Sequence, residues 1–310
     1  MSALPSPLLL VPPPPVLDAD GAPAPAVQTP RAAVRVTAAG GREIGAETLA
    51  EEVPVALVYN GISHAVMLAT PQDLEDFALG FSLSEGIIDS PDDLLDSELV
   101  VSDLSASTVL AGVPERGLSL ELKVTLRCFM RLKERRRTLA GRTGCGLCGT
   151  ESLAEAVRPV RGQAAAVRVD AAALARAMAE LPRHQVLQHT TGATHAAAWC
   201  APDGAVRWVR EDVGRHNALD KLIGSIAAAG VDRADGFVAV TSRASYEMVH
   251  KTASAGIGLL AAVSAPTALA VRTAEAAGLV LAGFVRGGRA VVYSHAGRVT
   301  GAAALAVPSA

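Results

Sequence analysis

Residues 237–263 read FVAVTSRASYEMVHKTASAGIGLLAAV, and this stretch decides the fold class. Two short apolar runs, Phe237 to Thr241 and Leu259 to Val263, flank a turn at Ser242-Arg243 and a helix predicted from about Ser245. Strands of this length separated by a helix are typical of a β-α-β unit, whose two strands are parallel.

The same alternation continues on both sides of this stretch. A helix with apolar residues at helical spacing is predicted from Arg215 to Ala229 and ends at Gly230. Another begins at Ser264-Ala265-Pro266-Thr267 and runs to Ala277. The remaining predicted strands are Val186 to Gln188, Ala196 to Cys200, Val206 to Arg210, Leu279 to Val285 and Arg289 to Tyr293. We therefore expect an α/β fold, with an open, largely parallel, doubly wound sheet covered by helices on both faces.

The first half of the chain predicts a smaller α+β domain. Glu52 to Tyr59 and Ile62 to Leu68 flank the turn Asn60-Gly61 and should form a hairpin. A helix should follow Thr70-Pro71 and end at Gly86, and residues 98 to 128 are predicted as further strands. The predicted domains are a disordered Pro/Ala-rich tail over 1–41, an N-terminal α+β domain over 42–150, and a C-terminal α/β domain over 151–305.

Composition narrows the class of protein. Of 310 residues, 50% are hydrophobic and only four are cysteine, which is too few for a disulfide scaffold and favours a cytoplasmic location. Prolines interrupt any signal-peptide core near the N-terminus. The uncharged window Thr252 to Val271 contains Gly256, Gly258 and Pro266, so we expect no membrane span.

The segment RTGCGLCG, residues 142–149, carries two thiols, Cys145 and Cys148, among three glycines. It follows a run with eight basic residues and one acid: Lys123, Arg127, Arg131, Lys133, Arg135, Arg136, Arg137 and Arg142 against Glu134. Positive charge stabilises a thiolate, which is the reactive form of cysteine. The pattern predicts nucleophilic thiols on an open, glycine-rich loop.

Polar residues follow three of the predicted parallel strands, where ligands bind in open α/β sheets. They are Ser242 and Arg243, Ser264 and Thr267, and Arg286 with Gly287 and Gly288. Arginine, hydroxyl groups and glycine at adjacent strand ends predict a phosphate site. The alternative is that the hydroxyl groups cap helices and that Arg243 pairs with Glu247. His216, at the start of the helix from Arg215, could face the ligand or merely pack.

Eight ordered stretches resemble the FdhD family of formate dehydrogenase accessory sulfurtransferases. They are Asn60-Gly61, MLATPQDLEDFALGFSLSEGII from Met67, RTGCGLCG, TTGATHAAA from Thr190, EDVGRHNALDKLIG from Glu211, SRASYEMVHK from Ser242, SAPTALAV from Ser264, and GFVRGGRAVVYS from Gly283. The resemblance covers about residues 42 to 298.

This resemblance implies a sulfur carrier. It would take persulfide sulfur from a cysteine desulfurase and pass it to the Mo-bis(molybdopterin guanine dinucleotide) cofactor of formate dehydrogenase. It implies Cys145 as the persulfide cysteine, Cys148 as the second thiol, and a cofactor segment made of Phe284, Val285, Arg286, Gly287, Gly288 and Arg289. It also implies a cytidine-deaminase-like core, although deamination itself is excluded because no glutamate lies two residues after His195.

Other functions remain as alternatives. Cys145 and Cys148 could be half of a zinc site completed by His189, His195, His216 or Cys200, but none of these offers a second tight pair. A nucleotide-binding module without sulfur chemistry is a further alternative. A net charge of −3 and 3% aromatic residues argue against nucleic-acid binding. The choice of molybdenum or tungsten and the oligomeric state stay open, with a homodimer as one candidate.

Overall fold

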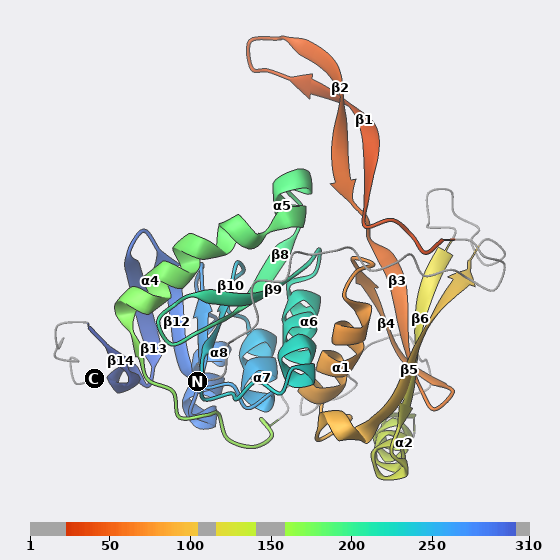
Figure 1. Cartoon of the computed structure of the whole chain (residues 1–310), viewed down its shortest axis with the longest axis vertical. Coiled ribbons are helices and arrows are strands. Elements are labelled where there is room, and N and C mark those ends of the chain that lie inside the picture. The colour runs from red at the N-terminus through yellow and green to blue at the C-terminus, as the bar shows by residue number, and fades with distance from the viewer. Residues whose placement is uncertain (1–22, 105–115, 141–158, 302–310) are drawn as a thin grey trace, which may run out of the picture.

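A computed structural model describes residues 23–104, 116–140 and 159–301, and the second half of the chain builds its largest sheet (Figure 1). The strand order is β13-β12-β11-β10-β8-β9. The strands are β8 His195–Cys200, β9 Val206–Asp212, β10 Phe237–Val240, β11 Leu259–Ala262, β12 Val280–Arg286 and β13 Arg289–Ser294. The predicted β-α-β unit is confirmed, because β10 and β11 are parallel neighbours joined through helix α7, Tyr246–Ser254.

Only the inner strands are parallel, so the sheet is more mixed than expected. β10, β11 and β12 run in one direction, whereas β8 and β13 are antiparallel to their neighbours. The connections explain the difference. β8 joins β9, and β12 joins β13, through loops too short for the crossover that parallel strands need.

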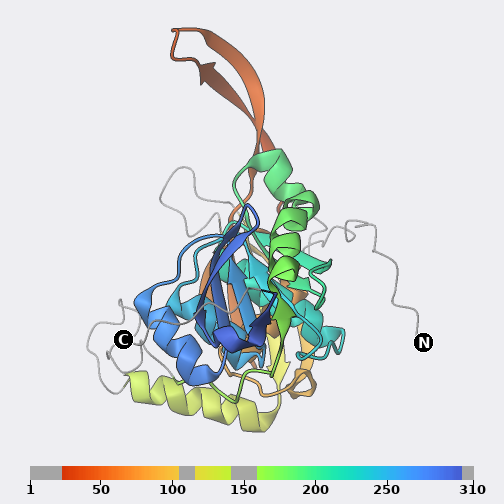
Figure 2. The ribbon, with the colours of Figure 1, turned by 90° about the vertical axis from the view of Figure 1, so that its left-hand side faces the viewer.

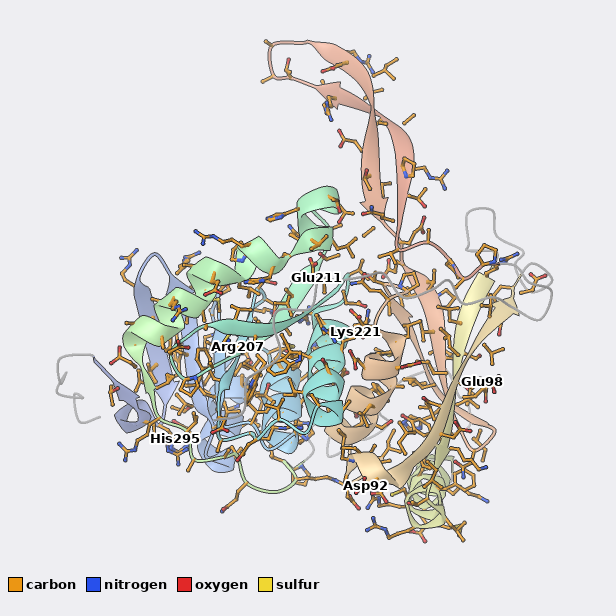
Figure 3. All side chains as sticks on the ribbon, viewed as in Figure 1. Asp92, Glu98, Arg207, Glu211, Lys221 and His295 are labelled. Carbon is orange, nitrogen blue, oxygen red and sulfur yellow. The ribbon has the colours of Figure 1, made fainter. Side chains whose placement is uncertain are left out.

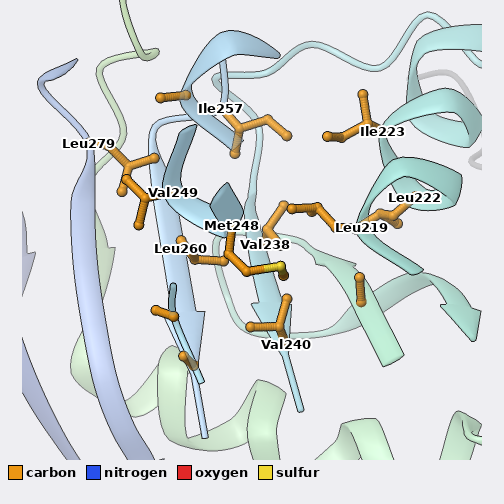
Figure 4. Packing of buried hydrophobic residues seen from close by; sticks show 14 of the residues in the cluster. Leu219, Leu222, Ile223, Val238, Val240, Met248, Val249, Ile257, Leu260 and Leu279 are labelled. Carbon is orange, nitrogen blue, oxygen red and sulfur yellow. The ribbon is translucent and has the colours of Figure 1, made fainter. Parts of the chain in front are cut away.

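Helices cover both faces of this sheet, as predicted for an α/β fold. Helices α6 (Arg215–Ala228), α7 and α8 (Ala268–Ala277) pack on one face around a cluster that includes Leu222, Met248 and Leu260 (Figure 4). Helix α4, Ala171–Glu180, covers the other face. Alanine is frequent in β8 and β11, so helix backbones can lie close to these strands.

The first half forms a separate four-stranded sheet in the order β4-β3-β6-β5. Its strands are β3 Val53–Tyr59, β4 Ile62–Ala69, β5 Leu94–Asp103 and β6 Arg116–Val124. The predicted hairpin is confirmed, with positive φ at both Asn60 and Gly61 as a tight turn requires. Helix α1, Leu74–Ser84, packs its apolar face on this sheet.

Helices α1 and α6 cross at two glycines and thereby join the two halves. A Cβ at Gly80 would overlap the carbonyl oxygen of Asp220, and one at Gly224 would overlap that of Asp76. Both positions therefore need glycine for steric reasons alone. The predicted boundary near residue 150 lies outside the described residues and stays a prediction.

A two-stranded ribbon, β1 Gln28–Val36 and β2 Arg42–Ala50, extends away from both sheets (Figure 2). The prediction of a disordered tail over 1–41 is wrong for this part, because residues 28–36 pair in register with 42–50. Composition rich in alanine and proline concealed a strand whose partner lies beyond the expected tail.

Two other expectations are corrected. Residues 126–128, predicted as part of a strand, begin helix α2, Leu126–Ala140, where Cys128 and Leu132 supply a buried pair at helical spacing. Of the basic run, Lys123 lies on β6, and the residues from Arg127 to Arg137 lie on α2. Residues Val186–Thr191 form helix α5 instead of a strand. The remaining short elements are η1 Pro91–Asp93, β7 Val169–Asp170, η2 Leu181–His184, η3 Ala296–Arg298 and β14 Val299–Thr300. No helix in the described ranges is long and apolar enough to cross a membrane.

Candidate functional site

The strand ends named from the sequence meet at one edge of the six-stranded sheet, here called the carboxyl edge. Strands β9 to β12 end there, and β8 begins there. Backbone hydrogen bonds join the loops after the strands: Ala244 N donates to Ala265 O over 3.2 Å, and Phe284 N donates to Ser264 O over 3.2 Å. The structure thus brings Ser242, Arg243, Ser264 and Thr267 beside Phe284, as the sequence predicts.

The segment Phe284 to Arg289 is the tip of the β12–β13 hairpin. Arg286 pairs with Arg289, and the central residues Gly287 and Gly288 have φ of 56° and 72°. A two-residue turn of this kind needs positive φ at both positions, which explains the two glycines without any ligand. Val285 is fully buried, so the expectation that it contacts the cofactor is corrected: it belongs to the core.

Phe284 has an unusual backbone for an aromatic residue. Its φ is 51°, in the left-handed region, and its ring lies 5.7 Å from the Arg286 guanidinium carbon in cation-π geometry. Such a conformation is strained for a side chain with a Cβ, and strain of this kind gathers at functional sites. Phe284 is about a third exposed at the carboxyl edge.

Two of the predicted hydroxyl groups, on Ser242 and Thr267, have local hydrogen-bond partners, whereas the Arg243 side chain has none among the described residues. Thr267 caps helix α8 by accepting from Ala270 N over 3.3 Å, and Ser242 Oγ donates to the carbonyl of Arg243 over 3.0 Å. Arg243 is exposed and does not pair with Glu247 among the described contacts. Glu247 instead places Oε2 2.8 Å from His216 Nε2. Burial lowers the pKa of His216, and the neighbouring Arg215 adds to that effect against the pull of Glu247.

A cavity of about 420 Å³ opens on the carboxyl edge between helix α5 and the ends of β8 and β10. Gln185, Gln188, Gly192, Ala193, Thr194, His195 and Thr241 line it. His195 faces Asp212 across the β8–β9 pair, and burial followed by the charge of Arg215 lowers its pKa. Among these lining residues, His195 was named from sequence as an alternative zinc ligand, whereas the two glutamines and Thr241 were missed.

A comparison with protein families assigns the chain. The model of the FdhD/NarQ family matches residues 50–300. The chain belongs to the FdhD/NarQ family. Within this family, it is 59% identical over 263 residues to the sulfur carrier protein FdhD of Cupriavidus necator, covering 84% of this chain and 86% of that protein. It is 56% identical to the sulfur carrier protein FdhD of Variovorax paradoxus, covering 82% and 87%.

A solved structure shares the fold of this FdhD/NarQ chain. It is a crystal structure of a proposed formate dehydrogenase accessory protein from Desulfotalea psychrophila, with a TM-score of 0.64 and 21% identity. The match covers 88% of this chain and all of that one. The similarity therefore supports the α/β architecture over nearly the whole described chain.

The two thiols predicted to react, Cys145 and Cys148, lie outside the described residues. The described chain reaches Ala140 at the end of α2 and resumes at Pro159, whose carbonyl oxygen lies 3.4 Å from His250 Nε2 on α7. The other cysteines are structural, as expected. Cys128 and Cys200 are fully buried, and burial raises the pKa of Cys200.

Two buried groups of ionic side chains in this FdhD/NarQ chain were both missed from sequence, and the first lies at the end of β9. Lys221, which Figure 3 labels on α6, places Nζ 2.6 Å from Asp212 Oδ2. The same Nζ donates to the Thr70 carbonyl. Lys251 Nζ lies 2.8 Å from both Asp220 and Glu85. Burial alone would lower the pKa of Lys251, but the two carboxylates outweigh it and raise the pKa.

Two of the alternative zinc ligands, His195 and Cys200, are kept apart by the fold. His195 and Cys200 begin and end the same strand, about 16 Å apart, so they cannot share one ion. One group, Asp89, Asp93 and Cys128, has ligand atoms within 4.8 Å of one another. Its carboxylates are already neutralised, because Arg127 and Arg131 lie 2.9 to 3.1 Å from them.

Proposed function

We propose that this chain is a cytoplasmic sulfur carrier in formate dehydrogenase maturation. It takes persulfide sulfur from a cysteine desulfurase on Cys145 and passes it to the Mo-bis(molybdopterin guanine dinucleotide) cofactor held at the carboxyl edge. Family membership and relatives named sulfur carrier protein FdhD support the carrier role.

Three exposed arginines at the carboxyl edge support the proposal that the cofactor, which accepts the sulfur, binds there. Arg243, Arg286 and Arg289 are exposed, and none forms an ion pair within the described ranges. By contrast, Arg127 and Arg131 on α2 form ion pairs with Asp89 or Asp93. Unpaired guanidinium groups beside a strained aromatic residue suit the diphosphate of a guanine dinucleotide, which arginine binds through charge-assisted hydrogen bonds.

The sulfur chemistry needs only thiols. The Cys145 thiolate attacks the terminal sulfur of the desulfurase persulfide, a new S–S bond forms, and the desulfurase cysteine leaves as a thiolate. Delivery at the sulfide level requires two electrons. Cys148 supplies them when its thiolate attacks the inner sulfur on Cys145, which forms the Cys145–Cys148 disulfide and releases hydrosulfide to the acceptor. A cellular dithiol reductant then restores both thiols.

Intact-mass spectrometry after incubation with a cysteine desulfurase and cysteine tests the carrier role. The wild-type chain and the Cys148→Ala variant should gain a cyanide-labile sulfur, and Cys145→Ala should not. Cys128→Ala is the matched control, because that thiol is buried and should leave loading unchanged. Full loading of Cys145→Ala would reject the assignment.

Calorimetry with GDP tests the acceptor site. Arg286→Ala should weaken binding by roughly ten- to a hundredfold, since a hydrogen bond to a charged group contributes about 1.5–3 kcal/mol. Arg272→Ala, an exposed arginine on α8, is the control and should bind like the wild type. Unchanged affinity in Arg286→Ala would leave the hairpin as a structural turn.

Zinc stoichiometry separates this proposal from a zinc module. A carrier purified under reducing conditions should hold much less than one zinc per chain and should have two rapidly alkylated thiols. One zinc per chain, released only on unfolding, would favour a structural site at Cys145 and Cys148.

A further inference from the structure

The β1–β2 ribbon has an apolar face that no described part of the chain covers. Residues paired directly across an antiparallel ribbon point to the same face. One face therefore carries Pro30, Ala32, Val34 and Val36 from β1 together with Ala46, Ile44 and Arg42 from β2. These residues are all exposed, Val36 by 67% and Ile44 by 81%. The opposite face is charged, with Arg35 Nε 2.7 Å from Glu47 Oε1. The ribbon is amphipathic, as expected of a sheet that packs one face on another surface.

Such a ribbon needs a surface that covers it. A two-stranded hairpin is only marginally stable alone in water, and a contiguous exposed apolar patch marks a site of protein contact. The ribbon extends away from both sheets of its own chain (Figure 2). Its base touches helix α5, where Thr190 Oγ1 donates to Gln28 Oε1 over 3.0 Å. The described remainder of the same chain therefore cannot cover the apolar face.

A second exposed apolar surface lies on the four-stranded sheet. Alternate residues of β3 are buried in one core with helix α1, which covers one side of this sheet (Figure 1). The opposite side, here called the outer face, carries Pro54 and Ala56 of β3, Val66 and Leu68 of β4, and Val100 of β5. Val66 and Leu68 are 61% and 57% exposed. The chain thus has two apolar surfaces, and its own ribbon points away from the outer face.

The outer face also carries two carboxylates that lack a counter-ion within the described ranges. Glu98 on β5 and Glu121 on β6 lie directly opposite each other, and Figure 3 labels Glu98 on the side of the sheet away from α1. Like charges in this position destabilise a sheet. Lys123, two residues along β6, forms no described ion pair with either of them. At the far end of the ribbon's apolar face, Arg42 is exposed and also has no ion pair among the described residues. The two surfaces are therefore complementary in charge as well as apolar.

The spacing between apolar and charged groups is the same on both surfaces. On the ribbon, Arg42 lies two residues from Ile44, toward the tip. On the outer face, Glu121 lies two residues along β6 from Ser119, which pairs with Ala56. At about 3.4 Å per residue, each step is about 7 Å. A ribbon that places Ile44 over the row of Ala56 therefore places Arg42 over the two glutamates.

We infer that two copies of this chain exchange ribbons, so that the apolar face of each ribbon packs on the outer face of the other copy. The ribbon leaves the sheet where β3 begins, whereas Glu121 pairs with Val58 near the end of β3. The ribbon tip of one copy must therefore point toward the far end of the other copy's sheet. Two copies that run in opposite directions about a two-fold axis beside the ribbon bases meet this requirement for both ribbons at once. The inference goes beyond the proposed function and does not depend on sulfur transfer.

The buried area favours this exchange over the packing of ribbon on ribbon. Each ribbon strand has 9 residues, and the outer strands β3 and β5 have 7 and 10, so the two surfaces match in length. At about 3.4 Å per residue and about 4.8 Å per strand, one ribbon face covers roughly 300 Å². Exchange covers two ribbons and two outer faces, roughly 1,200 Å² in all, which reaches the range of specific interfaces. Two ribbons packed on each other would cover only about half of that area.

The molar mass of the full chain, measured by light scattering and sedimentation under reducing conditions, tests the inference. The wild type should have twice the chain mass of 31.7 kDa. Ile44→Glu on the ribbon and Val66→Glu on the outer face should each weaken the dimer by about a hundredfold or more, because a charge enters an apolar contact that occurs twice in the dimer. Leu49→Glu, on the charged face of the ribbon, and Val291→Glu, at an exposed position of β13, are the matched controls and should remain dimers.

A charge exchange tests the ionic contact between the copies. Arg42→Glu should weaken the dimer by about tenfold, because it brings three carboxylates together at two places in the dimer. Adding Glu98→Arg should restore most of the lost affinity. Both positions are exposed, so this test does not depend on how the apolar variants fold.

Three results would overturn the inference. A monomeric wild type would do so, and would leave residues 1–22 of the same chain as the candidate to cover the outer face. A dimer that persists in both Ile44→Glu and Val66→Glu would place the interface elsewhere. A dimer lost in Ile44→Glu but kept in Val66→Glu would mean that the ribbon binds another surface. None of these results changes persulfide loading of Cys145, so they are distinguishable from a failure of the proposed function.

Discussion

Asp212 and Lys221 form a fully buried ion pair, with Oδ2 and Nζ 2.6 Å apart and neither side chain exposed. Asp212 also accepts from Thr70 N over 3.0 Å, so one carboxylate ties the end of β9 to the first half of the chain. Burial lowers the pKa of Lys221, and its contact with Asp212 offsets part of that effect.

Removing the cation of this pair should destabilise the protein strongly. Lys221→Met leaves the Asp212 carboxylate buried without its counter-ion, which typically costs about 3–5 kcal/mol of unfolding free energy. Arg176→Met is the control, because its pair with Asp203 is more than half exposed and should contribute at most about 1 kcal/mol. Urea unfolding measures both, and similar losses for the two variants would contradict the prediction.

A methyl group at the α1–α6 crossing should also be destabilising. Gly80→Ala and Gly224→Ala each place a Cβ against a helix carbonyl, so the helices must move apart at a cost of about 1–3 kcal/mol or more. Alanine otherwise favours a helix by about 1 kcal/mol, so the net sign reports the overlap. Gly297→Ala has open space around its Cβ and should be nearly neutral in thermal unfolding.

Asp93 should contribute acid-sensitive stability. Burial by itself would raise its pKa, but hydrogen bonds from the Asp89 N–H, Arg127 and Thr125 outweigh burial and lower the pKa to about 2. The folded-state pKa lies below the unfolded value of about 3.9, so the contribution is complete above that value and is lost as the pH falls toward 2.

A pH series of urea unfolding checks the Asp93 prediction. The stability difference between the wild type and Asp93→Asn should shrink between pH 4 and about pH 2. The exposed neighbour substitution Asp92→Asn should not reproduce this trend. A difference that stays constant across that range would show that the carboxylate charge of Asp93 does not contribute.

Substitution of Phe284 should affect the unfolding free energy and the affinity for GDP in different ways. Asparagine tolerates the left-handed conformation better than phenylalanine, so Phe284→Asn should leave the unfolding free energy unchanged or raise it by up to about 1 kcal/mol. The same variant should weaken GDP binding, because Arg286 loses the ring beneath its guanidinium. Lower stability with unchanged affinity would mean that the ring is structural.

Local patterns predicted those parts of the fold that depend on neighbouring residues. The β10–α7–β11 unit and the Asn60-Gly61 hairpin were recognisable because turn chemistry and periodicity are local signals. Helix α5 was not, because its first turn is stabilised by Glu211 from a distant strand. The β1–β2 ribbon was missed for a similar reason, since strand pairing is invisible to composition.

In the candidate site, too, the sequence predicted the features that depend on neighbouring residues and missed those that depend on distant ones. The sequence placed Ser242, Ser264 and Phe284 at one edge because parallel strands end together. It could not find Gln185, because only the structure shows that Glu211 has replaced it as the helix cap. The status of Val285 as core likewise depends on how the hairpin packs.

The glycine crossing of α1 and α6 has a consequence for synthesis on the ribosome. Ser84 on α1 and Asp220 on α6 bond to each other across 136 residues of chain. At about 5–20 residues per second, α1 waits on the order of 10 s for the helix that covers it. During that time Gly80 is not yet covered by α6, and Glu85 does not yet have Lys251 as its counter-ion. The yield of the protein in cells should therefore depend on chaperones more than its final stability suggests.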